Sequence, residues 1–187
     1  MSGNEKEGTR KSTFGSEVLE WTKVILISLI AAVAITTFIK PTLVKGESMY
    51  PTINEHDYLI INCTPYLSKN PSFGDIVVFE TDYHTDSGKE KDLIKRVIGL
   101  PGDAISIKDG VVYRNHEALD EPYINGDFTP GDMNEFVVEE NHLFVLGDNR
   151  SNSLDSRSKE IGVVPYEDIV GVVIVRLFPF NKIGPLE

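Results

Sequence analysis

The sequence ISIKDGVVYR, residues 105–114, is the stretch that best indicates the fold. Two β-rich runs flank Asp109 and Gly110. Asp-Gly between such runs favours a type I′ turn, in which both central residues have positive φ. We therefore predict an antiparallel hairpin at these residues.

Further short apolar runs on both sides of the hairpin predict strands. They are rich in β-branched side chains, which is typical of strands buried in a sheet, and they cover residues 58–63, 75–80, 92–98, 142–146 and 170–178. No long amphipathic helical pattern follows residue 41. We therefore predict a mainly β fold with an antiparallel β-sheet core.

Two polar segments predict loops. Residues 82–91 (DYHTDSGKEK) lie between two predicted strands, and residues 120–135 are rich in Gly, Pro, Asp and Asn, which favour turns. The hairpin and the second loop together predict a small inserted β subdomain at about residues 103–141.

An apolar segment, WTKVILISLIAAVAITTFI, occupies residues 21–39, and its last 16 residues carry no charge. This length is at the short end of what spans a bilayer. A cleaved signal peptide is an alternative, because Ala32-Val33-Ala34 resembles a cleavage site, and a buried core helix is another. Because the apolar run continues past Ala34, we predict a single transmembrane anchor.

The distribution of basic residues predicts the orientation of this anchor. Lys6, Arg10, Lys11 and Lys23 precede its apolar run or flank its start, whereas only Lys40 and Lys45 follow closely. Because basic residues accumulate on the cytoplasmic side, we expect residues 1–20 to be a cytoplasmic tail. Residues 41–187 would then form an extracytoplasmic domain.

Composition excludes some classes of protein. The 187 residues are 41% hydrophobic and 25% charged, which is typical of a globular protein. The formal net charge of −11 disfavours a nucleic-acid partner, because such proteins usually carry a basic face. Cys63 is the single cysteine, so no internal disulfide forms, and its place in a predicted strand favours a buried structural role over a nucleophile.

Ser48 begins the run SMYPT, residues 48–52, and eight residues separate it from Ile39. A serine is a weak nucleophile and needs a nearby base. The four histidines lie in no recognisable pattern, and there is neither H-E-x-x-H nor G-x-S-x-G; the histidines are His56, His84, His116 and His142. We therefore expect no metal or cofactor, while a histidine base has no specific support and stays open.

A neutral lysine is the other candidate base. An ordinary lysine has a pKa of ~10.4, and bringing it to ~7–8 costs about 3–5 kcal/mol, which burial among apolar groups can impose. Alternation along residues 93–98 gives both Lys95 and Arg96 apolar neighbours on their own faces. Arginine keeps its proton, so Lys95 is the candidate base. The alternative is two solvated charges on an edge strand.

Residues 147–157 (GDNRSNSLDSR) form a third polar segment. It is either an ordinary loop after the strand at 142–146 or a source of hydroxyls and a carboxylate–guanidinium pair that orient a catalytic group. Within and beyond it, residues 156–159 (SRSK) match the S-x-x-K motif of penicillin-binding enzymes, but K-T-G is absent and we set that match aside.

Four blocks in this order after an apolar segment give the chain a specific resemblance: SMYPT (48–52), GDIVVF (74–79), KRVIGLPGD (95–103) and GDNRSNSLDSR (147–157). The chain resembles the bacterial type I signal peptidases, Ser-Lys peptidases with a mostly β fold and a small inserted β subdomain. These enzymes remove signal peptides from exported proteins.

The resemblance implies roles for particular residues. Ser48 would be the nucleophile and Lys95 the general base, and the Ser153 hydroxyl would position the lysine amine. Asp155 and Arg157 resemble a supporting salt bridge, and Asp148 a structural member of the same loop.

One position departs from part of the family. Gly46 stands where some members carry a serine whose hydroxyl stabilises the oxyanion, and in this it resembles the Gram-positive members. The backbone N–H of Ser48 is then the one oxyanion donor that we can name.

The resemblance also implies cleavage after small residues at the −1 and −3 positions of secretory preproteins at a phospholipid membrane. Shallow apolar pockets would explain that preference, and their candidate lining residues are Val44, Met49, Val78, Leu93 and Ile94. The substrate would lie extended beside residues 93–95, as in β-augmentation. Two alternatives stay open: a self-cleaving Ser-Lys peptidase of the repressor type, and a non-catalytic membrane-anchored β module.

Overall fold

The structure is a computed structural model that describes residues 14–64, 71–81 and 92–186. The polar segment 82–91, predicted to be a loop, lies outside the described residues. The chain divides into two compact units, Met1–Thr37 and Phe38–Glu187.

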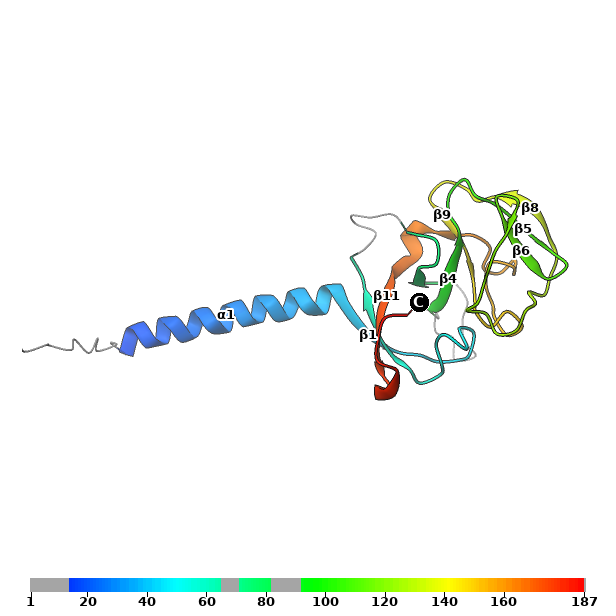
Figure 1. Cartoon of the computed structure of the whole chain (residues 1–187). Coiled ribbons are helices and arrows are strands. Elements are labelled where there is room, and N and C mark those ends of the chain that lie inside the picture. Colours follow the sequence, from blue (N-terminus) through cyan, green and yellow to red (C-terminus); the bar gives the residue numbers. More distant parts are fainter. Residues whose placement is uncertain (1–13, 65–70, 82–91, 187) are drawn as a thin grey trace, which may run out of the picture. The chain divides into compact units, whose positions relative to one another are not determined.

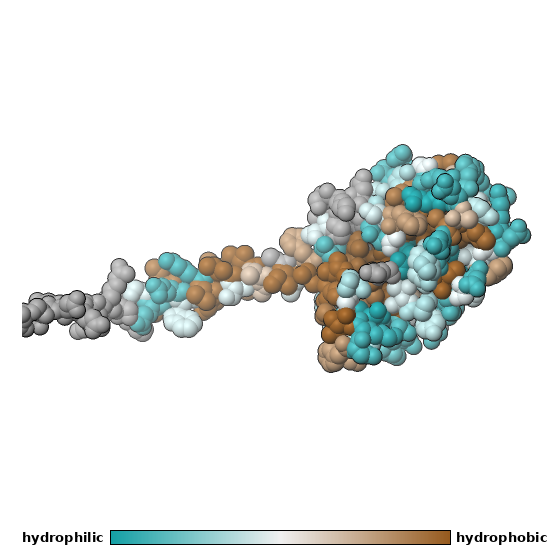
Figure 2. Space-filling model, in the orientation of Figure 1, coloured by the Kyte–Doolittle hydropathy of each residue, from teal (hydrophilic) through white to brown (hydrophobic). Residues whose placement is uncertain are grey.

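Helix α1, Phe14–Phe38, lies in the first unit except for its last residue. Its 25 residues extend about 38 Å at 1.5 Å per residue, more than the ~30 Å of a bilayer's hydrocarbon core. Apolar side chains are exposed along it, as Figure 2 shows in brown. The helix is therefore long and apolar enough to cross a membrane. It begins before the predicted anchor at Trp21, and Ile39 belongs to the following strand.

The second unit contains an antiparallel sheet (Figure 1), which confirms the predicted mainly β fold. This sheet has seven strands. In spatial order its strands are β1 (Ile39–Leu43), β2 (Tyr58–Asn62), β11 (Ile169–Phe178), β3 (Ile76–Phe79), β4 (Leu93–Gly99), β9 (His142–Leu146) and β10 (Val164–Pro165). Strand β4 lies inside this sheet, between β3 and β9. Short 3-10 helices lie on either side of β11: η1 (Tyr166–Asp168) precedes it and η2 (Phe180–Lys182) follows it.

A separate four-stranded sheet lies in the chain between β4 and β9 (Figure 1). Its order is β7 (Glu117–Ala118), β6 (Val111–Arg114), β5 (Ala104–Lys108) and β8 (Met133–Val137). The predicted hairpin is confirmed: Lys108 pairs with Val111, and Asp109 and Gly110 have φ of 51° and 80°. The loop predicted for 120–135 was wrong at its end, because Met133 begins β8 and pairs with Ile107.

Apolar side chains of the main sheet pack in separate clusters. The first core cluster comprises Val44, Met49, Ile53, Leu59, Ile61, Ile76, Val78 and Val173. Cys63 follows β2 and packs against this cluster; it is partly rather than fully buried, because its strand ends at Asn62. A second core cluster contains Val77, Phe79, Leu93, Val97, Leu143, Val145 and Val164.

Candidate active site

Ser48 and Lys95 lie in direct contact. Lys95 Nζ donates hydrogen bonds to Ser48 Oγ at 2.8 Å and to the Ile94 carbonyl at 2.9 Å. Lys95 is only 1% exposed, whereas Ser48 is half-buried. The edge-strand alternative for Lys95 and Arg96 was wrong, since β4 has strands on both sides and both side chains are buried.

Apolar side chains anchor the segment that carries Ser48 in the first core cluster. Met49 and Ile53 are four residues apart, both are buried in the first core cluster, and the Ile53 N–H donates to the Met49 carbonyl at 2.8 Å. Val44 lies in the same cluster and exchanges backbone hydrogen bonds with the segment at residues 56–57. Burial of these side chains leaves Ser48 at the boundary between core and solvent.

The turn at Gly147 to Asn149 holds the main chain of Ser48 from another side. The Asn149 N–H donates to the Ser48 carbonyl at 3.0 Å, and the Asn149 amide donates to the Glu47 carbonyl at 3.0 Å. A Cβ at Gly147 would lie 2.5 Å from the Ser48 carbonyl oxygen and 2.2 Å from Ser153 Oγ. Only glycine therefore fits at position 147.

Asp148 is fully buried and paired with Arg96. Nε and Nη2 of Arg96 donate to the two Asp148 carboxylate oxygens at 2.9 Å and 2.8 Å, and Thr52 Oγ1 donates to the same carboxylate at 2.5 Å. The arginine also donates to the Gly74 carbonyl at 3.1 Å. This pair ties the turn after β9 to β4 and to the run that begins at Ser48.

Asp155 and Arg157 form the two-pronged salt bridge that the resemblance implies for this loop. Arg157 Nε and Nη2 each lie 2.8 Å from an Asp155 oxygen, and Asp155 also accepts from the Gly147 N–H at 3.0 Å. Burial raises the pKa of Asp155, but the hydrogen bonds and charge of Arg157 outweigh it and leave the pKa below its ordinary value of 3.8.

Ser153 lies beside Gly147 with its hydroxyl buried. Among the described residues, no group meets hydrogen-bond geometry with Ser153 Oγ, although the hydroxyl is close enough to Asp155 to help lower that pKa. A hydrogen bond from Ser153 to the lysine amine is therefore absent from this arrangement, and the positioning role of Ser153 stays a prediction.

The surroundings of the Ser48 N–H suit an oxyanion donor. Within residues 14–64, 71–81 and 92–186 this N–H donates no hydrogen bond. Gly46 has φ of 93°, and its own N–H donates to the Glu55 carboxylate at 3.2 Å. No heavy atom outside the adjacent residues lies within 4 Å of a Cβ built at Gly46. Position 46 thus offers space beside Ser48, while its N–H is engaged elsewhere.

Four of the five candidate pocket residues share one part of the core. Val44, Met49 and Val78 are buried in the first core cluster, and Ile94 packs against it. The structure does not bring Leu93 together with them, because its side chain lies in the second core cluster. Neighbouring residues on a strand face opposite sides of the sheet, which explains the separation of Leu93 from Ile94.

Three residues were missed by the sequence analysis. Arg150 lies in the block at residues 147–157, and its side chain is fully buried against Glu121 and Thr129. Arg150 could have been identified, because it is a charged residue inside a block that the resemblance had already singled out. Nothing in the local sequence indicated Glu121 or Thr129, because they contact Arg150, which is 29 and 21 residues away along the chain.

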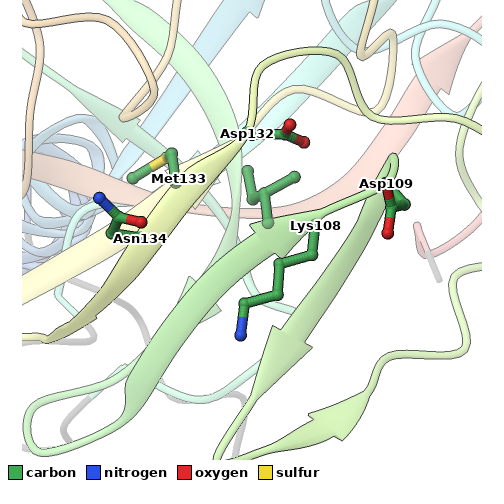
Figure 3. Close-up of a pocket in the computed structure, with 6 residues that line it drawn as sticks. Lys108, Asp109, Asp132, Met133 and Asn134 are labelled. Atoms are coloured by element: carbon green, nitrogen blue, oxygen red, sulfur yellow. The ribbon is translucent and has the colours of Figure 1, made fainter.

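Other parts of the molecule do not form a competing catalytic or metal site among the described residues. Figure 3 shows a pocket between the β5–β6 turn and the start of β8, lined by Ile107, Lys108, Asp109, Asp132, Met133 and Asn134. No predicted site residue lines it. In the S-x-x-K match, Ser156 Oγ accepts from the Val145 N–H and Lys159 is exposed. In the described part of the chain, no group of three His, Cys, Asp or Glu could hold a metal ion, and no histidine hydrogen-bonds to Ser48.

Comparisons with known proteins give the following matches. A family model described as "Signal peptidase, peptidase S26" matches residues 18–178. Signal peptidase I of Bacillus amyloliquefaciens is 35% identical over 96% of this chain and 97% of its own length. Signal peptidase I S of Bacillus subtilis (strain 168) is 35% identical over 88% of this chain and 91% of its own. A solved signal peptidase I from Enterococcus faecalis V583 aligns with 30% identity and a TM-score of 0.45, covering 56% of this chain and 97% of that one.

Proposed function

Since the chain belongs to the signal peptidase family, peptidase S26, we propose that it removes N-terminal signal peptides from exported preproteins with a Ser48–Lys95 dyad. The observation that carries the dyad is the 2.8 Å contact between Lys95 Nζ and Ser48 Oγ, with the amine buried. The family match favours this function over a repressor-type peptidase or a non-catalytic β module.

The lysine must be neutral to act as a base. Burial disfavours a charged ammonium because it removes the water that stabilises the charge. One N–H of a neutral amine can stay on the Ile94 carbonyl, which directs the lone pair of Nζ toward the Ser48 hydroxyl. The Ser48 hydroxyl would then donate its hydrogen bond to the Lys95 amine, as proton abstraction requires.

In the first step, Lys95 Nζ takes the proton of Ser48 Oγ while Oγ bonds to the carbonyl carbon of the −1 residue. The Ser48 N–H donates to the oxyanion that forms. The C–N bond then breaks, and the ammonium of Lys95 returns its proton to the departing amine of the mature protein. In the second step, water gives a proton to Lys95 Nζ and its oxygen bonds to the ester carbon. The bond from that carbon to Ser48 Oγ then breaks, the signal peptide leaves as a carboxylic acid, and the Lys95 ammonium returns the proton to Oγ.

The edge of β4 supports an extended substrate. Residues 93–96 pair with β3, but pairing with β9 begins only at Arg96. In the described residues, Leu93 and Ile94 therefore lie before the part of β4 that pairs with β9. A substrate strand added there would pass Ser48, and main-chain pairing of this kind needs no particular side chains.

Small residues at −1 and −3 fit the side chains near this edge. Val44, Met49 and Val78 are packed in the first core cluster, so they would offer shallow apolar contacts rather than a deep pocket. We propose that these three and Ile94 contact the small side chains. Leu93 would contribute through its main chain, since its side chain lies in the other cluster.

Membrane anchoring by α1 would place this chemistry where signal peptides are cut. The eight residues between Ile39 and Ser48 reach at most about 30 Å when extended. The basic residues before α1 favour a cytoplasmic N-terminus and an extracytoplasmic domain. Protection of the N-terminus, but not of the domain, from protease added outside intact cells would support this orientation; the reverse pattern would contradict it.

A preprotein carrying alanine at −1 and −3 tests the proposed function. The full chain in detergent micelles should release a mature protein whose new N-terminus follows the −1 alanine. Replacing that alanine by phenylalanine should block cleavage, and Ser48→Ala should process neither substrate. Equal cleavage of the alanine and phenylalanine substrates would reject the specificity, and undiminished processing by Ser48→Ala would reject the serine.

A further inference from the structure

The loop that connects β7 and β8 packs its polar groups against the turn that holds Ser48. We call residues 119–131 the bracing loop. Resting on the proposed function, we infer that Glu121 in this loop is a positioning residue for the Ser48–Lys95 pair, which it affects through Arg150 and the backbone of Gly147 to Asn149.

The first link joins Ser48 to the turn at Gly147. Asn149 bonds to the carbonyls of both Glu47 and Ser48, and Gly147 leaves no room for a side chain between itself and the Ser48 carbonyl. A displacement of this turn would therefore be passed to the Ser48 main chain. The distance between Ser48 Oγ and Lys95 Nζ depends on the same main chain.

The second link joins the turn to the bracing loop. Arg150 Nε donates to the Gly147 carbonyl at 3.0 Å. The Asn125 N–H donates to the Asp148 carbonyl at 2.9 Å, and the Asn125 amide reaches Asn149 Oδ1 at 3.3 Å. Three consecutive residues of the turn thus accept hydrogen bonds from Arg150 or from the bracing loop.

The third link is the ion pair between Glu121 and Arg150, which fixes the position of the Arg150 side chain. Nη1 and Nη2 of Arg150 donate to the two Glu121 oxygens at 2.8 Å and 2.6 Å, and Nη1 also donates to Thr129 Oγ1 at 2.7 Å. The arginine side chain is 0% exposed and that of Glu121 is 6% exposed. A buried guanidinium needs this carboxylate, because an unpaired buried charge is strongly unfavourable.

Tyr123 joins the same network to the other buried arginine. Its hydroxyl donates to Glu121 Oε1 at 2.8 Å, and the Arg96 guanidinium lies 4.0 Å from the centre of its ring. Burial raises the pKa of Tyr123, together with the charge of Glu121, so the hydroxyl keeps its proton for that bond. Arg96 in turn holds Asp148. The bracing loop therefore contacts both arginines that fix the turn.

Four variants of the full chain in detergent micelles test this inference: Glu121→Gln, Glu121→Ala, the double variant Glu121→Ala/Arg150→Met, and the control Glu117→Ala. Glu117 is an exposed acidic residue on neighbouring β7. For each we would measure kcat and KM on a peptide that spans a cleavage site, together with the melting temperature.

We expect kcat to fall about 10–100-fold in Glu121→Ala with KM within about twofold, because a misplaced reacting group lowers the rate more than it lowers binding. Glu121→Gln keeps one acceptor oxygen and should recover part of the rate. The double variant removes the buried unpaired charge and should recover melting temperature but not kcat. Glu117→Ala should match wild type in every measurement.

Recovery of kcat together with melting temperature in the double variant would show that Glu121 only supports folding, and would overturn the inference. An unchanged kcat in Glu121→Ala would do the same. The proposed function fails separately, in the same assay, if wild type does not cleave the peptide or if Ser48→Ala cleaves it equally well.

Discussion

Replacing Gly147 by alanine should slow catalysis without unfolding the protein. The added Cβ would lie 2.5 Å from the Ser48 carbonyl oxygen, whereas real Cβ contacts essentially never fall below 3.0 Å. Either Ser48 or the turn must then move by at least about 0.5 Å. The Cβ would also lie 2.2 Å from Ser153 Oγ, so both neighbours resist the change.

The size of the effect follows from that displacement. A reacting group misplaced by ~1 Å can cost about 100-fold in rate, so a shift of half that size or more should lower kcat by about 10–100-fold. Overpacking of this kind destabilises by about 1–3 kcal/mol. Steady-state cleavage of a signal-peptide substrate and thermal melting of the same sample would measure both effects.

Gly99→Ala is the matched control. Its Cβ would lie 3.0 Å from side chains of Ile105, Phe144 and Val138, in the core and away from Ser48. We expect it to lower stability while leaving kcat per folded molecule unchanged. A kcat within twofold of wild type for Gly147→Ala would refute the claim that this turn positions Ser48.

Three further changes address the surrounding residues. Ser153→Ala should lower the rate if the hydroxyl positions the lysine amine, and an unchanged rate would remove Ser153 from the mechanism. Stability should stay within about 0.5 kcal/mol, because the buried hydroxyl makes no hydrogen bond among the described residues. Arg96→Lys cannot reproduce the two-pronged bond to Asp148 and should cost about 1–3 kcal/mol in urea unfolding, whereas a wild-type midpoint would contradict the importance of that geometry. Asp155→Asn should destabilise at neutral pH; because the folded pKa of Asp155 is lowered, its contribution is present above pH 3.8 and is lost as the pH falls through the folded value. The difference in unfolding free energy between Asp155→Asn and wild type should therefore shrink in acid, and a difference that is constant with pH would argue against an ionised Asp155.

The local sequence was sufficient for the elements that depend on neighbouring residues. Asp109 and Gly110 predicted a tight hairpin because their positive φ is a local property, and the structure has that hairpin. Strand β1 was missed, because Pro41 interrupts its short run and its partner β2 lies about twenty residues away. The first residues of β8, which we predicted as part of a loop, depend in the same way on pairing with β5.

The environment of the charged residues could not be predicted from their neighbours. Alternation showed apolar residues around Lys95 and Arg96, but it did not show that both side chains are buried. Their neighbours come from distant parts of the chain: Ser48 contacts Lys95, and Asp148 and Tyr123 contact Arg96. The order of four sequence blocks identified Ser48 and Lys95 as candidates. The bracing contacts of Glu121 could not be identified, since they depend on how the inserted segment folds back on the loop at residues 147–157.

The most direct test of the account is single-turnover cleavage of a preprotein by wild type, Ser48→Ala and Lys95→Arg, with the full chain in detergent micelles. Arginine preserves the positive charge but not the basicity of a neutral amine. We expect wild type alone to release the mature protein, and both variants to stay folded and inactive. Cleavage by Lys95→Arg at the wild-type rate would contradict the assignment of Lys95 as the base.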